Sequence, residues 1–163
     1  MNPQWINYEN NTQLYTHYSI SHSHNNFNTI QFRGYNHNFI IASKKLFLLY
    51  FKNIIHNVPA HGCKEPDECF ISEQNKTIFI IEKKFQKYNG STCEKIQTPD
   101  FKLWHLKKLI PKYKIIYIYV LSDWFKHNCI HELKYLHYKK IPVFWGSSPY
   151  YKKNIIKFIH NNL

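Results

Sequence analysis

The stretch EPDECFISEQNKTIFIIEKKFQ, Glu65 to Gln86, contains two short apolar runs on either side of a polar segment. β-Branched and aromatic residues dominate both runs, a pattern typical of a β-hairpin. A turn at 74–75 or at 73–76 gives the same register, and that register brings Asp67 opposite Glu82. Directly opposed side chains on antiparallel strands have Cβ atoms about 4.5–5.5 Å apart. We therefore expect the two carboxylates to lie side by side on one face of the hairpin.

Two neighbouring carboxylates repel each other unless a cation lies between them. Carboxylate oxygens, a strand carbonyl and water positions together form the hard-cation site that Mg²⁺ prefers. The two-residue period of a strand places Lys84 and Gln86 on the same face as Glu82, whereas Lys83 points to the other face. A charged surface hairpin without a metal is the simpler alternative.

Pro66-Asp67, fourteen further residues and then Glu82-Lys83-Lys84 resemble the motif of the PD-(D/E)xK nucleases. The stretch from Phe85 to Lys102 is similar to the segment after this motif in some small type II restriction endonucleases. The resemblance implies an α/β fold with the restriction endonuclease-like core, a mixed central sheet flanked by helices. In this family the core is a helix, three antiparallel strands, a helix and another strand, and we expect it over residues 44–146.

The resemblance also implies roles for single residues. Asp67 and Glu82 would bind Mg²⁺ together with the backbone carbonyl of Lys83, and Lys84 would be the catalytic lysine. Glu68 could replace Asp67 if the strand were shifted by one residue, because such a shift exchanges the two faces. A surface acid on the opposite face is the alternative for Glu68.

Polar residues after the motif are candidates for contact with DNA. A glycine-serine turn that opens a helix can offer N–H groups to phosphate, and glutamine can bind an adenine edge. A connecting loop without such contacts is the alternative for the residues after position 89, whereas Gln86 could instead brace Lys84 or have only a structural role. Two residues before the motif could line the same cleft, namely His61 and Lys64. The candidates after the motif are Gln86, Gly90, Ser91, Lys95, Gln97 and Thr98.

The rest of the chain completes a single domain of 163 residues. Residues 1–28 are rich in Asn, Ser, Thr and His without a sustained period, which predicts a loosely organised arm. We expect an extended segment over 29–42, a helix over 44–58, helices over 100–110, 123–140 and 150–163, and strands over 113–122 and 141–146. The alternation of strands and helices after residue 100 predicts parallel crossover connections.

The formal net charge is +12, from 22 Lys and Arg against 10 Asp and Glu. Such an excess favours a polyanionic partner, with nucleic acid first and an anionic membrane surface second. The sequence offers no strongly amphipathic basic helix for a membrane surface. Arg33 is the only arginine, so phosphate contacts are expected mainly from lysine. The longest apolar segment, Leu46 to Phe51, is too short to cross a bilayer, and we expect a soluble intracellular protein without a membrane partner.

The four cysteines show no paired spacing of the zinc-ribbon or redox kind. His127, Cys129 and His131 alternate, but on a helix such side chains point in different directions. A zinc site there is the less favoured interpretation, and the inferred compartment argues against disulfides.

Together with the resemblance, these patterns predict a Mg²⁺-dependent endonuclease that cuts double-stranded DNA at specific sites, as type II restriction enzymes do. The resemblance to type II restriction enzymes also implies a homodimer and a cognate DNA methyltransferase acting on the same site. A structure-specific or repair nuclease of the same fold is the alternative among enzymes. The alternative of another class is a non-catalytic basic protein that binds nucleic acid.

Overall fold

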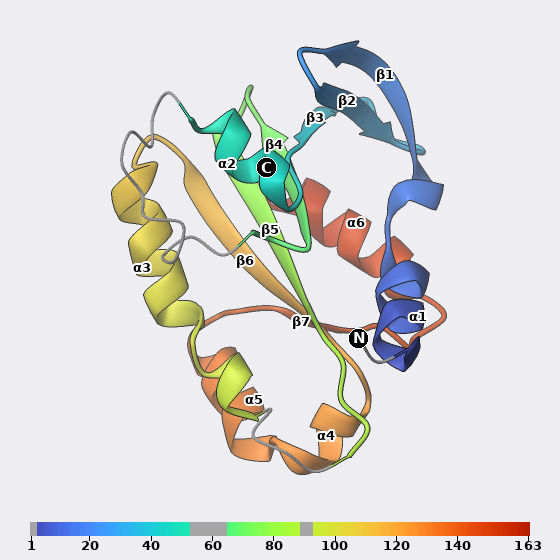
Figure 1. Cartoon of the computed structure of the whole chain (residues 1–163), viewed down its shortest axis with the longest axis vertical. Coiled ribbons are helices and arrows are strands. Elements are labelled where there is room, and N and C mark those ends of the chain that lie inside the picture. The colour runs from blue at the N-terminus through green and yellow to red at the C-terminus, as the bar shows by residue number, and fades with distance from the viewer. Residues whose placement is uncertain (1–2, 53–64, 89–92) are drawn as a thin grey trace.

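The computed structural model describes residues 3–52, 65–88 and 93–163, which form a seven-stranded mixed sheet with six α-helices (Figure 1). Along the chain the strands are β1 (Tyr18–His24), β2 (Phe27–Phe32), β3 (Asn38–Ile41), β4 (Glu68–Ser72), β5 (Thr77–Lys84), β6 (Lys114–Leu121) and β7 (Val143–Trp145). The helices are α1 (Pro3–Thr12), α2 (Lys45–Tyr50), α3 (Pro99–Leu109), α4 (Trp124–Asn128), α5 (Ile130–Tyr138) and α6 (Tyr151–Asn161).

The strands lie in the sheet in the same order as in the chain. Each pair from β1 to β5 is antiparallel, whereas β5, β6 and β7 are parallel to one another. Parallel neighbours need crossover connections, and α3 supplies the first while α4 and α5 supply the second. The carboxyl ends of β5, β6 and β7 therefore all lie at the same end of the sheet.

Helices cover both faces of the sheet, as Figure 1 shows with α3 on one side and α6 on the other. Alternating residues of the central strands face the two layers. Ile80 and Tyr119 belong to the core under α2, α3, α4 and α5. Phe79 and Ile118 belong to the core under α6. Since both faces are buried, β6 is almost continuously apolar and β5 is apolar over residues 78–81, as is usual for central strands covered on both sides.

The predicted hairpin register is confirmed, because β4 pairs with β5 from Ser72 opposite Thr77 to Glu68 opposite Ile81. The strands predicted over 113–122 and 141–146 and the helix over 150–163 are also present, shortened by a few residues, and the helix over 100–110 is present one residue earlier, as α3. The predicted helix over 123–140 is two helices, which are separated at Cys129.

The N-terminal part differs from the expectation of a loose arm. Residues 3–12 form α1, and residues 18–24 form the edge strand β1. The expected core over 44–146 also differs in order, because β3, the third antiparallel strand beside β4 and β5, precedes α2. The mixed sheet and its helices are as predicted, whereas the restriction endonuclease-like core remains a proposal.

The prediction against disulfides is wrong, since Cys93 forms one with Cys129 across 36 positions of sequence. The expected intracellular compartment argues against disulfides in general, but it cannot show that two cysteines far apart in the sequence are neighbours in the fold. The bond ties η2 (Cys93–Ile96) to the junction of α4 and α5. It also occupies the sulfur that a zinc ion at His127 and His131 would need, and both histidines are exposed.

None of the helices in residues 3–52, 65–88 and 93–163 combines the length and the apolarity needed to cross a membrane.

Candidate active site

Asp67 and Glu82 lie next to each other where β4 begins. The β4–β5 ladder ends with Glu68 opposite Ile81, so the next positions along it are 67 and 82. Both side chains fall on the face that carries Cys69 and Ile80. The Asp67 carboxylate accepts a hydrogen bond from the backbone N–H of Lys83, with 2.7 Å between nitrogen and Oδ2. This bond fixes the Asp67 side chain against β5, beside Glu82.

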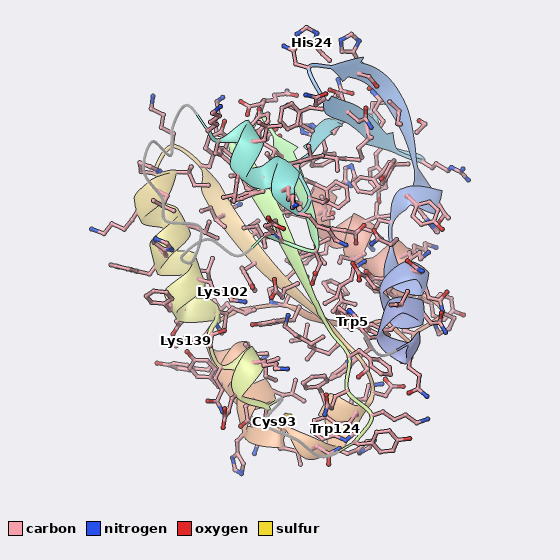
Figure 2. The ribbon with its side chains drawn as sticks, viewed as in Figure 1. Trp5, His24, Cys93, Lys102, Trp124 and Lys139 are labelled. Atoms are coloured by element: carbon pink, nitrogen blue, oxygen red, sulfur yellow. A yellow bond between two sulfur atoms is a disulfide. The ribbon has the colours of Figure 1, made fainter. Side chains whose placement is uncertain are left out.

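Two lysines contact the carboxylate of Glu82. The Nζ of Lys84 lies 2.7 Å from Oε1, and the Nζ of Lys102 lies 3.0 Å from the same oxygen. Lys102 reaches this point from α3 and also donates to the hydroxyl of Tyr117, 3.0 Å away. Figure 2 shows Lys102 on the side of α3 that faces the sheet. The prediction that Lys84 lies beside Glu82 is therefore confirmed. Its catalytic role stays a prediction.

The two carboxylates respond differently to this environment. Burial raises the pKa of Asp67, and the nearby charge of Glu82 raises it further, against the opposing effects of the Lys83 N–H and of Lys84. Burial alone would also raise the pKa of Glu82, but the ammonium groups of Lys84 and Lys102 outweigh it and lower the pKa. Asp67 is therefore the carboxylate whose charge is less well compensated by the protein.

The donor set fits a hard divalent cation. Both lysine contacts to Glu82 are made to Oε1. Burial and, to a smaller extent, the charge of Glu82 raise the pKa of Asp67, and a cation between the carboxylates would offset both effects. The carbonyl of Lys83 points to the same edge of β5 as its N–H, and thus toward Asp67. At the facing position, Pro66 has no N–H to donate to that carbonyl. Asp67, Glu82 and this carbonyl are the groups that would hold Mg²⁺.

Glu68 lies on the opposite face, as its alternative interpretation required, but it is not a surface acid. Its side chain is 5% exposed and pairs with Lys83, which is fully buried, at 2.9 Å. The other Glu68 oxygen accepts the N–H of Leu14 at 2.9 Å. The shift in register that would bring Glu68 into the site does not occur, so Glu68 is a structural residue.

The candidates for DNA contact divide into two places. Gln86 and Lys95 line a cavity of about 370 Å³ that also includes Lys84 and Lys87. Gln97 lies elsewhere, with its amide bonded to Glu132 of α5 at 3.0 Å. The hydroxyl of Thr98 bonds the carbonyl of Lys95 at 3.4 Å, just before α3. Four candidates fall outside the described residues, namely His61, Lys64, Gly90 and Ser91.

Three charged residues near the site were not predicted. One is Lys102, and the other two are Glu9 of α1 and Lys44, which pair at 2.7 Å and act electrostatically on Asp67. Lys102 could have been found, because it lies four residues before the buried Leu106, on the inner face of a predicted helix. Glu9 offered no signal, since residues 1–28 were not predicted to be helical.

No family model matches the chain, and no curated protein or solved structure matches it significantly.

Proposed function

We propose that the protein is a Mg²⁺-dependent endonuclease that cleaves double-stranded DNA, as the resemblance to PD-(D/E)xK nucleases implies. The observation that carries the proposal is the meeting of Asp67, Glu82 and Lys84 on one face of the β4–β5 hairpin. The net charge of +12 favours a polyanionic substrate, and three lysines surround the adjacent 370 Å³ cavity.

Each residue has a role in hydrolysis under this proposal. Asp67 and Glu82 hold the cation, and the Lys84 ammonium orients the attacking water and stabilises negative charge on the phosphate. Bound Mg²⁺ would neutralise phosphate charge and lower the pKa of a coordinated water. Water adds to phosphorus in line with the leaving oxygen and gives up a proton to solvent, one P–O ester bond breaks, and the leaving oxygen takes up a proton from solvent. Lys102 keeps Glu82 ionised and is a positioning residue.

Site specificity and a homodimer belong to the same proposal. A palindromic site requires a symmetric pair of active sites, so a type II enzyme of this size would act as a dimer on DNA. A cognate methyltransferase would protect the same site in the host.

Digestion of a supercoiled plasmid tests the function directly. We expect the full chain to cut in Mg²⁺ and not in EDTA, and to produce discrete fragments. Asp67→Asn, Glu82→Gln and Lys84→Ala should each lower the cleavage rate by about 100-fold or more, because each removes a group that acts on the transition state. DNA binding in the absence of metal should survive all three changes.

Matched controls are Asp100→Asn and Lys107→Ala, which remove the same charges from α3 and should leave the rate unchanged, since Asp100 pairs with Lys139 at 2.8 Å and Lys107 is exposed. Cleavage at the wild-type rate by the three site variants would refute the active site. A smear of products, or activity on branched DNA alone, would favour the structure-specific alternative. Binding without any metal-dependent cleavage would favour the non-catalytic alternative.

A further inference from the structure

A second cavity, of about 580 Å³, lies between α1 and the carboxyl ends of the parallel strands. Its volume is in the range of small-molecule binding sites, about 300–1,000 Å³. In open α/β sheets, ligands bind outside the carboxyl ends of the strands. Figure 2 shows Trp5 of α1 and Trp124 of α4 at this end of the molecule. The cavity is lined by Gln4, Asn7, Tyr8, Asn11, Thr12, Phe85, Gln86, Lys87, Ser122, Asp123, Trp124, Gly146 and Ser147.

One face of α1 supplies an unusual set of side chains to this cavity. Gln4, Asn7, Tyr8 and Asn11 share one helix face through their i, i+3, i+4, i+7 spacing, with Tyr8 half-buried and the other three exposed around the mouth of the cavity. Three of the four are carboxamides, which combine a donor and an acceptor in one plane. Burial raises the pKa of the Tyr8 phenol, with a further effect of the Asp123 charge, so this hydroxyl stays protonated and can donate.

The cavity adjoins the cavity beside the candidate active site, because one segment of the chain lines both. Phe85, Gln86 and Lys87 line both the 580 Å³ cavity and the 370 Å³ cavity that contains Lys84. Ser122 holds this segment in place, since its Oγ accepts the N–H of Gln86 and donates to the Gln86 carbonyl, both at 3.0 Å. Gln86 follows Lys84 by two residues, or about 7 Å of extended chain.

The lining indicates what kind of group would bind. One lysine and one aspartate, Lys87 and Asp123, give no excess of positive charge for a phosphate. The rings of Tyr8, Phe85 and Trp124 offer flat apolar surface beside the carboxamides. Nucleobases are recognised by this combination, through stacking on aromatic rings and hydrogen bonds from amides to their edges.

We propose that the 580 Å³ cavity binds a nucleobase of the DNA strand beside the phosphate that is cut. The inference rests on the proposed nuclease function for its substrate, and it adds the place where the strand's sequence is recognised. A base unstacked from the strand enters between α1 and residues 85–87. The carboxamides of Asn7 and Asn11 then contact its edge, together with the side-chain oxygen of Gln86, whose Nε2 donates to the Tyr88 carbonyl.

Binding of short single-stranded oligonucleotides in EDTA tests this proposal separately from cleavage. The probes are homopolymers of each base and a strand of abasic sugar phosphates, followed by fluorescence anisotropy. We expect at least one base to bind about tenfold tighter than the abasic strand. Asn7→Leu and Asn11→Leu should remove that difference without weakening the abasic strand. Tryptophan fluorescence should be quenched by the preferred base and much less in Trp124→Phe.

Asn10→Leu is the matched control, since Asn10 is exposed on the same helix and does not line the cavity. It should bind every probe as the wild type does. Gln86→Ala gives an independent variant if a change in α1 impairs folding. Equal binding of base-containing and abasic strands, or wild-type base preference in Asn7→Leu and Asn11→Leu, would overturn the proposal. Free mononucleotides binding as tightly as the strands would overturn DNA as the source of the base. Loss of base preference with intact Asp67-dependent cleavage leaves the nuclease proposal standing.

Discussion

At the scale of single residues, the two carboxylates of the site have opposite effects on stability. Asp67 is buried beside Glu82, and its raised pKa means that folding disfavours its charged form. Glu82 has two lysine partners, and its lowered pKa means that folding favours its charged form. A residue kept at a cost in stability is typical of functional sites, where the requirement of activity opposes that of folding.

Substitutions of the two carboxylates should therefore change the free energy of unfolding in opposite directions at neutral pH. Above the carboxyl pKa values, the raised pKa of Asp67 makes the folded state less stable, so Asp67→Asn should increase the free energy of unfolding. The lowered pKa of Glu82 stabilises the folded state above the unfolded pKa of about 4.3, so Glu82→Gln should decrease that free energy. Changes on the order of 1 kcal/mol are expected. Urea unfolding at pH 7 measures both.

The pH dependence of the free energy of unfolding tests whether the two pKa shifts cause these changes. The stabilisation that Glu82 provides is lost as the pH falls through its lowered folded-state pKa, and the penalty from Asp67 disappears as that group becomes protonated. The two variants should therefore converge toward the wild type in acid. Mg²⁺ should stabilise the wild type and not Asp67→Asn, by mass action on the folded state. Glu94→Gln, an exposed acid on η2, should change little at any pH. A decrease in stability for Asp67→Asn at pH 7 would contradict the account.

At the scale of elements, the sequence predicted the β4–β5 hairpin together with its register. Apolar runs of strand length around a polar turn leave one way of pairing, and a shift by one residue would have buried the wrong face. This register alone predicts that Asp67 and Glu82 are neighbours and that Lys84, not Lys83, lies on the same face. These were the parts of the candidate site that local pattern could determine.

Other elements depended on contacts that the local pattern does not contain. The helix α1 has few apolar residues. Its less exposed positions include the polar residues Glu9 and Thr12 beside Trp5 and Tyr8, so its sequence lacks the apolar period that predicts a helix. The pairing of Cys93 with Cys129 joins segments that are 36 positions apart, and the contact of Lys102 with Glu82 joins a helix to a strand. The helical period can place Lys102 on the inner face of its helix, but neither its contact with Glu82 nor the pairing of the two cysteines can be identified before the chain is folded.

A buried ion pair connects β4 with β5 on the face opposite the site. Lys83 and Glu68 are almost completely buried, and their charges compensate each other at 2.9 Å. Lys83→Met should lower the free energy of unfolding by about 3–5 kcal/mol, because Glu68 would stay buried without its partner. In the double variant Glu68→Gln, Lys83→Met most of this loss should be recovered, since glutamine can still accept the N–H of Leu14. Urea unfolding of the single and double variants measures the difference.

Lys107→Met on the exposed side of α3 is the control for this pair, with an expected change within about 0.5 kcal/mol. If Lys83→Met were as stable as the wild type, the pair would not contribute to the β4–β5 connection. If the double variant were no more stable than the single one, the loss would come from packing and not from the unpaired charge.

At the scale of the whole molecule, the candidate site and the lysines beside it lie at the carboxyl ends of the parallel strands. The antiparallel part of the sheet supplies Asp67, and the parallel part supplies the strand ends where both cavities lie. A net charge of +12 attracts a polyanion from any direction, but only lysines beside the site can hold a strand in the reacting position. Lys84, Lys87 and Lys95 line the smaller cavity and, under the proposed function, would be the lysines that contact the strand there.

The salt dependence of DNA binding separates these lysines from the general charge. Each phosphate contact releases condensed counterions, so the logarithm of the binding constant falls linearly with the logarithm of salt concentration. Lys87→Ala and Lys95→Ala should each reduce that slope by about one, as expected for a lost phosphate contact. Lys157→Ala removes an exposed charge from α6, on the opposite face of the sheet, and should leave the slope unchanged. Titrations of a DNA duplex in EDTA at several salt concentrations measure the slopes. Equal slopes for the wild type and both cavity variants would mean that the strand does not pass through the cavity, whatever the affinity.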